Sequence, residues 1–192
     1  MKIKIGDTLR IASIKGNGYT RFGVWVGKVE SIDEHGTMCG TWGDLSVAED
    51  DEYQVVDYPD CTVVSFERMQ HLHESKRGKS GQKREEIEVE WLKAVKSIAP
   101  CIGLPCTVCY YSDKRAATVT RIISDKEIAV SHNVVKCLDY YAGDYEVLPE
   151  LYEREDIFTK RKNGEWVMKG QEVRDGVVLM LHYQRHYIDP HF

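Results

Sequence analysis

Two stretches of the C-terminal half combine aromatic rings with cationic side chains, each at the end of an expected strand. They are Tyr110, Tyr111, Asp113, Lys114 and Arg115, and then Arg161, Lys162, Trp166 and Lys169. Aromatic rings stack on nucleobases, while Arg and Lys hold phosphates by charge and hydrogen bonds. If the two stretches meet in the fold, they form a site for a small phosphorylated or nucleotide ligand. For Trp166 the structural alternative is burial, since one face of a tight hairpin must pack against a core.

A basic stretch between two expected helices is a second candidate surface. Its cationic members are Lys76, Arg77, Lys79, Lys83 and Arg84. No acidic residue interrupts the stretch 76–84, and its glycines allow a close approach of the backbone. Such a loop can contact the phosphates of a nucleic acid, or it can be a solvated linker. It is not a phosphate-binding loop of the Walker type, because His73 stands where that motif needs glycine.

The cysteines do not define a metal site. Cys106 and Cys109 have the two-residue gap that zinc sites favour. However, residues 104–111 have the pattern of a strand, where side chains three apart point to opposite faces. No second cysteine pair has this spacing. We expect small packing residues here, with no metal and no cofactor.

The histidines give no catalytic signature either. His182, His186 and His191 gather near the C-terminus with Asp189, where exposed side chains of a last strand and tail are the simplest interpretation. No cysteine or histidine lies in a local motif that activates a nucleophile. We therefore expect no catalytic residues and a protein that is not an enzyme.

Residues 1–60 have the pattern of a small β-barrel. Short β-prone runs are separated by turns, as in Asp33-Glu34-His35-Gly36. The order, which begins with Gly-Asp-x-Leu-x-Ile at residues 6–11, resembles that of SH3-like barrels. Tyr19, Phe22 and Trp25 could line an exposed aromatic groove there.

Residues 61–101 are expected to be a helical connector that contains the basic loop 76–84. Phe66, Met69 and Leu72 recur at helical spacing, as do Ile87, Trp91, Val95 and Ile98 further along. Pro100 ends the second run.

Residues 102–192 return to a β pattern and form the expected C-terminal β domain. We predict strands at 107–111, 117–123, 127–131, 157–162, 165–169 and 177–183. Asn163-Gly164 predicts a hairpin with a type I′ turn. The fold class is therefore mainly β (α+β), with two small SH3-like or barrel-like β units joined by a helical segment.

Three motifs of the C-terminal half occur together. They are Tyr-Ser-Asp-x-x-Ala-x-Thr-Val at 111–119, Arg-Lys-Asn-Gly-x-Trp-Val-x-Lys-Gly at 161–170, and Tyr-x-Asp-x-x-Phe at 187–192. Residues 103–192 with these motifs resemble a family of phage-encoded proteins of unknown function. The family has Gly-His-Arg where His182, Tyr183 and Gln184 stand here. The resemblance implies a phage or prophage source and supplies no reaction.

Composition narrows the class of protein. The 192 residues are 42% hydrophobic and 30% charged, with a formal net charge of −5, so a surface covered in positive potential is excluded. No window approaches the roughly 20 apolar residues of a membrane helix, and the first residues do not form a signal peptide. We expect a cytoplasmic protein, here of an infected bacterial host, with reduced cysteines.

These observations favour a non-catalytic, phage-encoded binding protein. Its most concrete form is a sponge that sequesters a nucleotide-type host immune signal, an anti-defence role in which a homo-oligomer would fit. One alternative is a nucleic-acid- or protein-binding module that uses the basic loop and the barrels. A second alternative is an enzyme with a Cys or His centre. A membrane partner is not expected.

Overall fold

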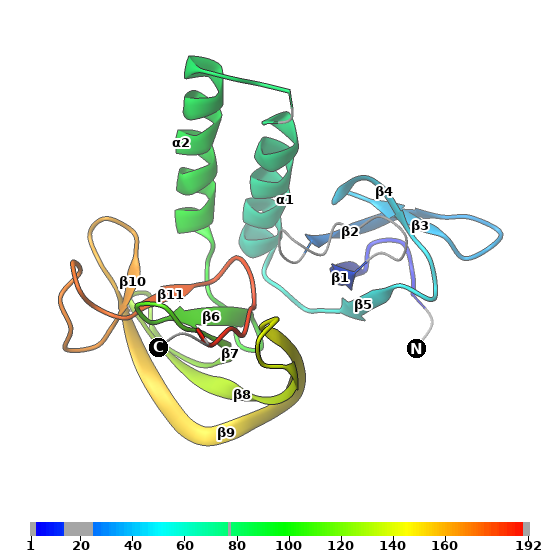
Figure 1. The fold of residues 1–192 in the computed structure, drawn as a ribbon. Coiled ribbons are helices and arrows are strands. Elements are labelled where there is room, and N and C mark those ends of the chain that lie inside the picture. Colours follow the sequence, from blue (N-terminus) through cyan, green and yellow to red (C-terminus); the bar gives the residue numbers. More distant parts are fainter. Residues whose placement is uncertain (1–2, 14–24, 77, 190–192) are drawn as a thin grey trace. The chain divides into compact units, whose positions relative to one another are not determined.

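The computed structural model describes residues 3–13, 25–76 and 78–189. It divides into two compact units, Met1–Ala99 and Pro100–Phe192 (Figure 1). The fold is mainly β, with two β units and a pair of helices, as the sequence predicted. Tyr19, Phe22 and Arg77 lie outside the described residues.

The first unit contains an antiparallel sheet in the order β4-β3-β2-β1-β5. Its strands are β1 (Thr8–Ser13), β2 (Trp25–Ile32), β3 (Met38–Gly40), β4 (Gly43–Val47) and β5 (Glu52–Val55). Leu9, Ile11 and Trp42 are at most 1% exposed at the centre of its core. Trp25 is partly buried against this core, so its ring already contributes to packing. The likeness to SH3-like barrels stays a prediction.

The helices α1 (Asp60–Ser75) and α2 (Gln82–Ser97) belong to this first unit. Lys28 of β2 forms an ion pair of 2.8 Å with Asp60, and Thr41 donates a hydrogen bond to Glu67, which fixes α1 on the sheet. Arg68 forms an ion pair with Glu90 across the two helices at 3.0 Å. The segment that the sequence presented as a connector is thus part of a sheet-and-helix unit. No helix among the described residues is long and apolar enough to cross a membrane.

The second unit is a closed barrel in the order β10-β11-β6-β7-β8-β9. Its strands are β6 (Pro105–Cys109), β7 (Lys114–Ser124), β8 (Glu127–Asp139), β9 (Asp144–Lys160), β10 (Trp166–Met168) and β11 (Val178–Met180). Cross-strand partners share one face of a sheet. The pairs Val119↔Val130 and Ile128↔Phe158 consist of fully buried residues, and they mark the face that lines the barrel interior.

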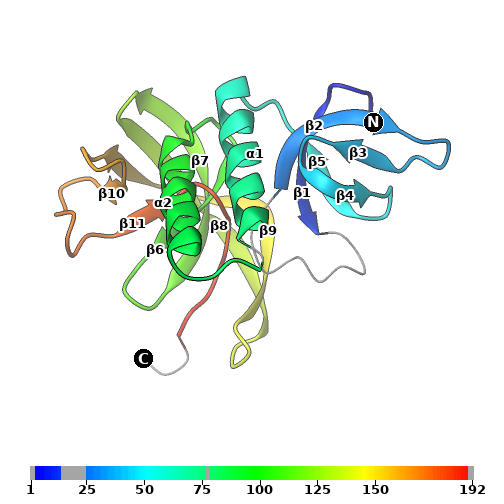
Figure 2. The ribbon, with the colours of Figure 1, turned by 90° about the horizontal axis from the view of Figure 1, so that it is seen from above.

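The hairpin of β8 and β9 is much longer than predicted. The sequence indicated only 127–131 and 157–162, whereas the paired strands run to Asp139 and from Asp144 (Figure 2). The added part has exposed apolar side chains, such as Tyr141 at 84% exposure, and its register shifts three times. Most of its side chains are exposed, so it has little of the hydrophobic alternation from which strands are recognised in a sequence.

The predicted hairpin at Asn163-Gly164 forms, but its turn type was wrong. Gly164 has φ of 85°, whereas no non-glycine residue among those described has a positive φ. The amide of Gly164 donates to the carbonyl of Arg161 at 2.9 Å, and the amide of Arg161 donates to Glu165 at 2.7 Å. This is a longer loop, a type I turn followed by a left-handed glycine, in place of the two-residue type I′ turn.

Candidate functional site

Strand register places the beginning of the second predicted ligand-binding stretch beside the β7–β8 turn, away from the β6–β7 turn that carries the first. The first stretch lies in the turn between Cys109 and Lys114, at one end of β7. The second begins beside the turn at the other end of β7, because the amide of Lys160 donates to the carbonyl of Lys126 at 2.8 Å. Trp166 itself is linked to Arg115 across three strand spacings, through Leu179 and Val108, so the two residues lie about 14 Å apart at ~4.8 Å per spacing. The side chains of the two stretches contact different partners, and we call the two places the β6–β7 end and the β7–β8 end.

At the β7–β8 end the side chains are engaged by the fold. Trp166 is 4% exposed, and the ammonium of Lys160 lies 5.7 Å from the centre of its ring. Arg161 donates to the carbonyl of Gln171 at 2.6 Å, and Lys169 forms an ion pair with Glu127 at 2.7 Å. Lys162 is exposed. Burial of the Trp166 ring favours the structural interpretation of this residue over stacking on a ligand.

At the β6–β7 end a ring and a cation are already paired. The guanidinium of Arg115 lies 5.2 Å from the centre of the Tyr110 ring, and Tyr111 is 99% exposed. Partial burial raises the pKa of Tyr110, and nearby Arg115 opposes this shift. The backbone of Lys114 exchanges two hydrogen bonds with Tyr187, at 2.8 and 2.7 Å. The amide of Asp189 donates to the carboxylate of Asp113 at 3.1 Å. These bonds bring the C-terminal segment onto this end of the barrel.

A histidine and a carboxylate face the barrel interior at the same end. His132 pairs with Ala117 and Asp156 pairs with Val130, so both lie on the face that includes buried Ala117 and Val130. Nε2 of His132 lies 3.1 Å from Oδ2 of Asp156, and their side chains are 18% and 11% exposed. Nδ1 of His132 is buried and has no hydrogen-bond partner within the described chain. Burial of a polar atom without a partner is uncommon in folded proteins.

The C-terminal segment adds a second imidazole. The ring of His186 lies 4.7 Å from that of Tyr145 on β9, centre to centre. Both ring nitrogens of His186 are buried, and neither has a partner among the residues that the structure describes. Burial lowers the pKa of His186, Arg115 and His132 lower it further, and Asp113 opposes them.

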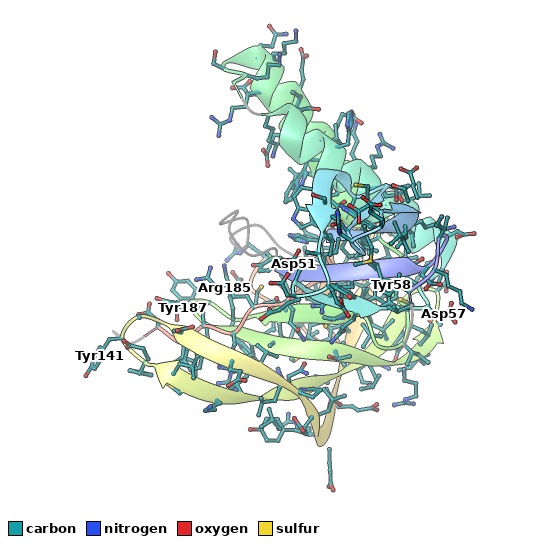
Figure 3. The ribbon with its side chains drawn as sticks, turned by 90° about the vertical axis from the view of Figure 1, so that its right-hand side faces the viewer. Asp51, Asp57, Tyr58, Tyr141, Arg185 and Tyr187 are labelled. Carbon is teal, nitrogen blue, oxygen red and sulfur yellow. The ribbon has the colours of Figure 1, made fainter. Side chains whose placement is uncertain are left out.

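Two further residues of this segment hold it in place. The guanidinium of Arg185 lies 5.2 Å from the centre of the Tyr187 ring (Figure 3). That ring covers Gly143 in the β8–β9 turn so closely that an added Cβ would lie 2.8 Å from it. The neighbouring Tyr141 points away from the rest of the hairpin at its tip (Figure 3).

We call this group of side chains the barrel-end cluster. Its members are Tyr110, Arg115, His132, Tyr145, Asp156 and His186. Sequence reasoning found Tyr110 and Arg115 but missed the other four. His132 continues the two-residue alternation of Ile128 and Val130, which was the one available signal. His186 was interpreted as an exposed tail residue, whereas tertiary contacts bury its ring nitrogens.

The basic loop has fewer cations available to contact a nucleic acid than its sequence indicated. The ammonium of Lys76 forms an ion pair with Glu88 of α2 and lies 4.7 Å from the centre of the Trp91 ring. No acidic residue interrupts the stretch in the sequence, but the structure places Glu88 of α2 beside Lys76. Lys79, Lys83 and Arg84 are exposed.

Two thiols of the barrel, those of Cys106 and Cys109, are poorly suited to nucleophilic chemistry. Burial raises the pKa of Cys106 far above its ordinary value, and burial also raises that of Cys109. A buried thiol that stays protonated is a weak nucleophile. Among the described residues no three metal-ligating side chains come together as a metal site.

Comparisons with known proteins add no assignment. No family model matches the chain, and no match was found among curated proteins or solved structures. The resemblance of residues 103–192 to phage-encoded proteins stays a prediction.

Proposed function

We propose that the C-terminal unit is a non-catalytic binding module that captures a small nucleotide-type ligand at the β6–β7 end of its barrel. In the phage context that the sequence motifs indicate, such a module would act as a sponge for a nucleotide-type host immune signal. A homo-oligomer is compatible with this role.

One observation supports the proposal above the others. Three imidazole nitrogens, Nδ1 of His132 and both nitrogens of His186, are buried without partners in the described chain. They lie at the same end of the barrel as the pair of Tyr110 and Arg115. Groups of this kind are expected where a ligand completes the hydrogen bonding, and the neighbouring ring and cation match the base and phosphate of a nucleotide.

The proposal is tested by capture and release. The purified full-length chain is incubated with a panel of cyclic mononucleotides and cyclic dinucleotides, separated from unbound ligand, heated and analysed by mass spectrometry. We expect one or more members of the panel to be retained and recovered chemically intact. Failure to retain any member at micromolar protein would refute capture of a nucleotide-type signal.

Two matched variants locate the site. Arg115→Gln removes the cation beside Tyr110, while Lys162→Gln removes an exposed cation at the β7–β8 end. Loss of a hydrogen bond to a charged group predicts about a tenfold or larger weakening for Arg115→Gln. Lys162→Gln is expected to bind like the wild type. Equal effects of the two substitutions would contradict a site at the β6–β7 end.

An enzyme is the second candidate, and the pair of His132 and Asp156 favours it. A histidine oriented by a carboxylate is a common general base. The capture experiment separates the two functions, because an enzyme would release an altered ligand. An altered product that disappears in His132→Gln would replace the binding proposal with a catalytic one.

The nucleic-acid alternative rests on three exposed cations of the first unit, Lys79, Lys83 and Arg84. This alternative predicts DNA or RNA binding that weakens steeply with salt and with neutralisation of the three side chains. Binding of that kind by the wild type would assign a function to the helical hairpin instead.

A further inference from the structure

The hydrogen bond of His132 fixes what its other nitrogen can do. A carboxylate accepts hydrogen bonds, so Nε2 of His132 donates to Asp156 across 3.1 Å. In the neutral ring Nδ1 is then an acceptor, and it is buried without a partner in the described part of the chain. The position calls for a donor from another molecule.

The ring of His186 supplies the complementary groups. A neutral imidazole has one donor and one acceptor nitrogen. Both nitrogens of His186 are buried, and neither finds a partner in the residues described. The ring lies 4.7 Å from Tyr145, so an aromatic surface borders these polar atoms.

The charges around the two rings nearly balance. Arg115 on β7, Asp113 in the β6–β7 turn and His132 on β8 act electrostatically on His186, and Tyr145 on β9 contacts its ring. Asp113 offsets Arg115, and Asp156, which lies beside His132, forms an ion pair with Arg154 at 3.5 Å. Arg115 is exposed beside Tyr110 and remains the candidate contact for the phosphate, whereas the buried imidazole nitrogens suit an uncharged polar group.

From this geometry we infer that the barrel-end cluster recognises the hydrogen-bonding edge of an uncharged nitrogen heterocycle, such as a nucleobase. His132 and His186 contact its donors and acceptors, and the Tyr145 ring packs beside it. The inference rests on the proposed function and goes further, because it assigns these histidines to the base and leaves the phosphates to other groups.

The experiment compares probes that share the phosphate or share the base. The wild-type chain is titrated calorimetrically with the four common nucleosides, their 5′-monophosphates, ribose 5-phosphate and inorganic phosphate. We expect at least one nucleoside to bind, and ribose 5-phosphate and inorganic phosphate not to bind at the same concentration.

Two pairs of variants test the histidines. His132→Leu and His186→Leu remove the ring nitrogens, while His132→Asn and His186→Asn keep short polar groups that donate or accept. Each Leu variant is expected to weaken the nucleoside by about tenfold, and each Asn variant by about threefold or less. The near-ultraviolet circular dichroism of each variant shows whether it is folded.

A pH titration of the wild type provides a measurement that needs no variant. Protonation of His186 turns its acceptor nitrogen into a donor, so nucleoside affinity should stay constant from pH 8 to 7 and fall as the solution becomes more acidic. The groups that face His186 are Arg115, His132 and Tyr145 of the cluster and Asp113 in the adjacent β6–β7 turn.

The outcomes separate this inference from the proposed function. If nucleotides bind but the Leu variants bind them as well as the wild type, the histidines do not read the base, and capture by other groups stands. If ribose 5-phosphate binds as tightly as the matching nucleotide, the base is not recognised and the inference is overturned. If neither these probes nor the cyclic nucleotides bind the wild type, both proposals fall.

Discussion

The two ends of the C-terminal barrel have similar side chains in the sequence, but these side chains make different contacts in the structure. At the β7–β8 end, Trp166 is buried, Arg161 donates to a backbone carbonyl and Lys169 pairs with Glu127. At the β6–β7 end, rings and cations are paired, yet imidazole nitrogens of His132 and His186 stay buried without partners in the described chain. Aromatic and basic residues at strand ends therefore do not define a binding site by themselves. The two ends differ in which buried polar atoms lack a partner in the described chain: Nε of Arg161 at the β7–β8 end, and imidazole nitrogens of His132 and His186 at the β6–β7 end.

The largest expected effect concerns the role of Trp166 in the core. Trp166→Ala should lower the free energy of unfolding by about 3–5 kcal/mol, as for other buried aromatic residues. Tyr110→Ala, at the other end, should cost less than half of that, because Tyr110 is only partly buried. Guanidinium unfolding followed by circular dichroism measures both. Equal losses would mean that the two ends contribute alike to the core and would remove the contrast.

Buried histidines of the C-terminal segment should make the free energy of unfolding depend on pH, whereas Trp166 has no titratable group. Burial lowers the pKa of His182 from 6.5 to about 4 and also lowers that of His186. Below pH 6.5 His182 binds a proton in the unfolded chain, whereas in the folded chain it stays neutral down to about pH 4. Stability should therefore rise with pH between these values and level off above them, with His182 contributing up to about 3 kcal/mol.

Unfolding of the wild type and of His182→Gln at pH 4.5, 5.5 and 7.5 checks this prediction. The difference between the two proteins isolates the histidine from the carboxylates that titrate in the same range. A difference that does not change with pH would show that His182 is accessible to protons in the folded state.

The smallest expected effect concerns the contact that holds the C-terminal segment on the β8–β9 turn. Gly143 and Gly170 both have left-handed backbone, with φ of 67° and 86°, but only Gly143 has the Tyr187 ring where a Cβ would lie. Each Gly→Ala substitution should cost about 1–2 kcal/mol for the backbone alone. Gly143→Ala should in addition speed hydrogen exchange of the Tyr187 amide, which donates to Lys114. Equal exchange of this amide in both variants would argue against the ring contact.

The sequence predicted the elements better than their pairing. The short strands of the first sheet, both helices and most strands of the barrel follow from alternation, helical spacing and turn residues. The added length of β8 and β9 escaped prediction, because most of its side chains are exposed and few apolar residues alternate along it. The loop of Asn163-Gly164 was recognised, but its geometry depends on how far the β9 and β10 ladder extends.

The candidate site was predicted only in its local part. Tyr110, Asp113, Lys114 and Arg115 are close in sequence, so a strand-end pattern was enough to single them out. His132 and Asp156 are 24 residues apart and meet through the β8–β9 ladder. His186 arrives from a segment that no local pattern marks as buried.

By itself the sequence determined that the chain builds two β units with helices and that rings and cations accumulate at strand ends, because these features depend on neighbours along the chain. Only the tertiary structure decided that the two aromatic stretches contact different partners, that Trp166 is enclosed, and that two histidines join Tyr110 and Arg115. The physical reason is that strand register and burial depend on pairing between distant segments, and a side chain's exposure is settled only when the barrel closes around it.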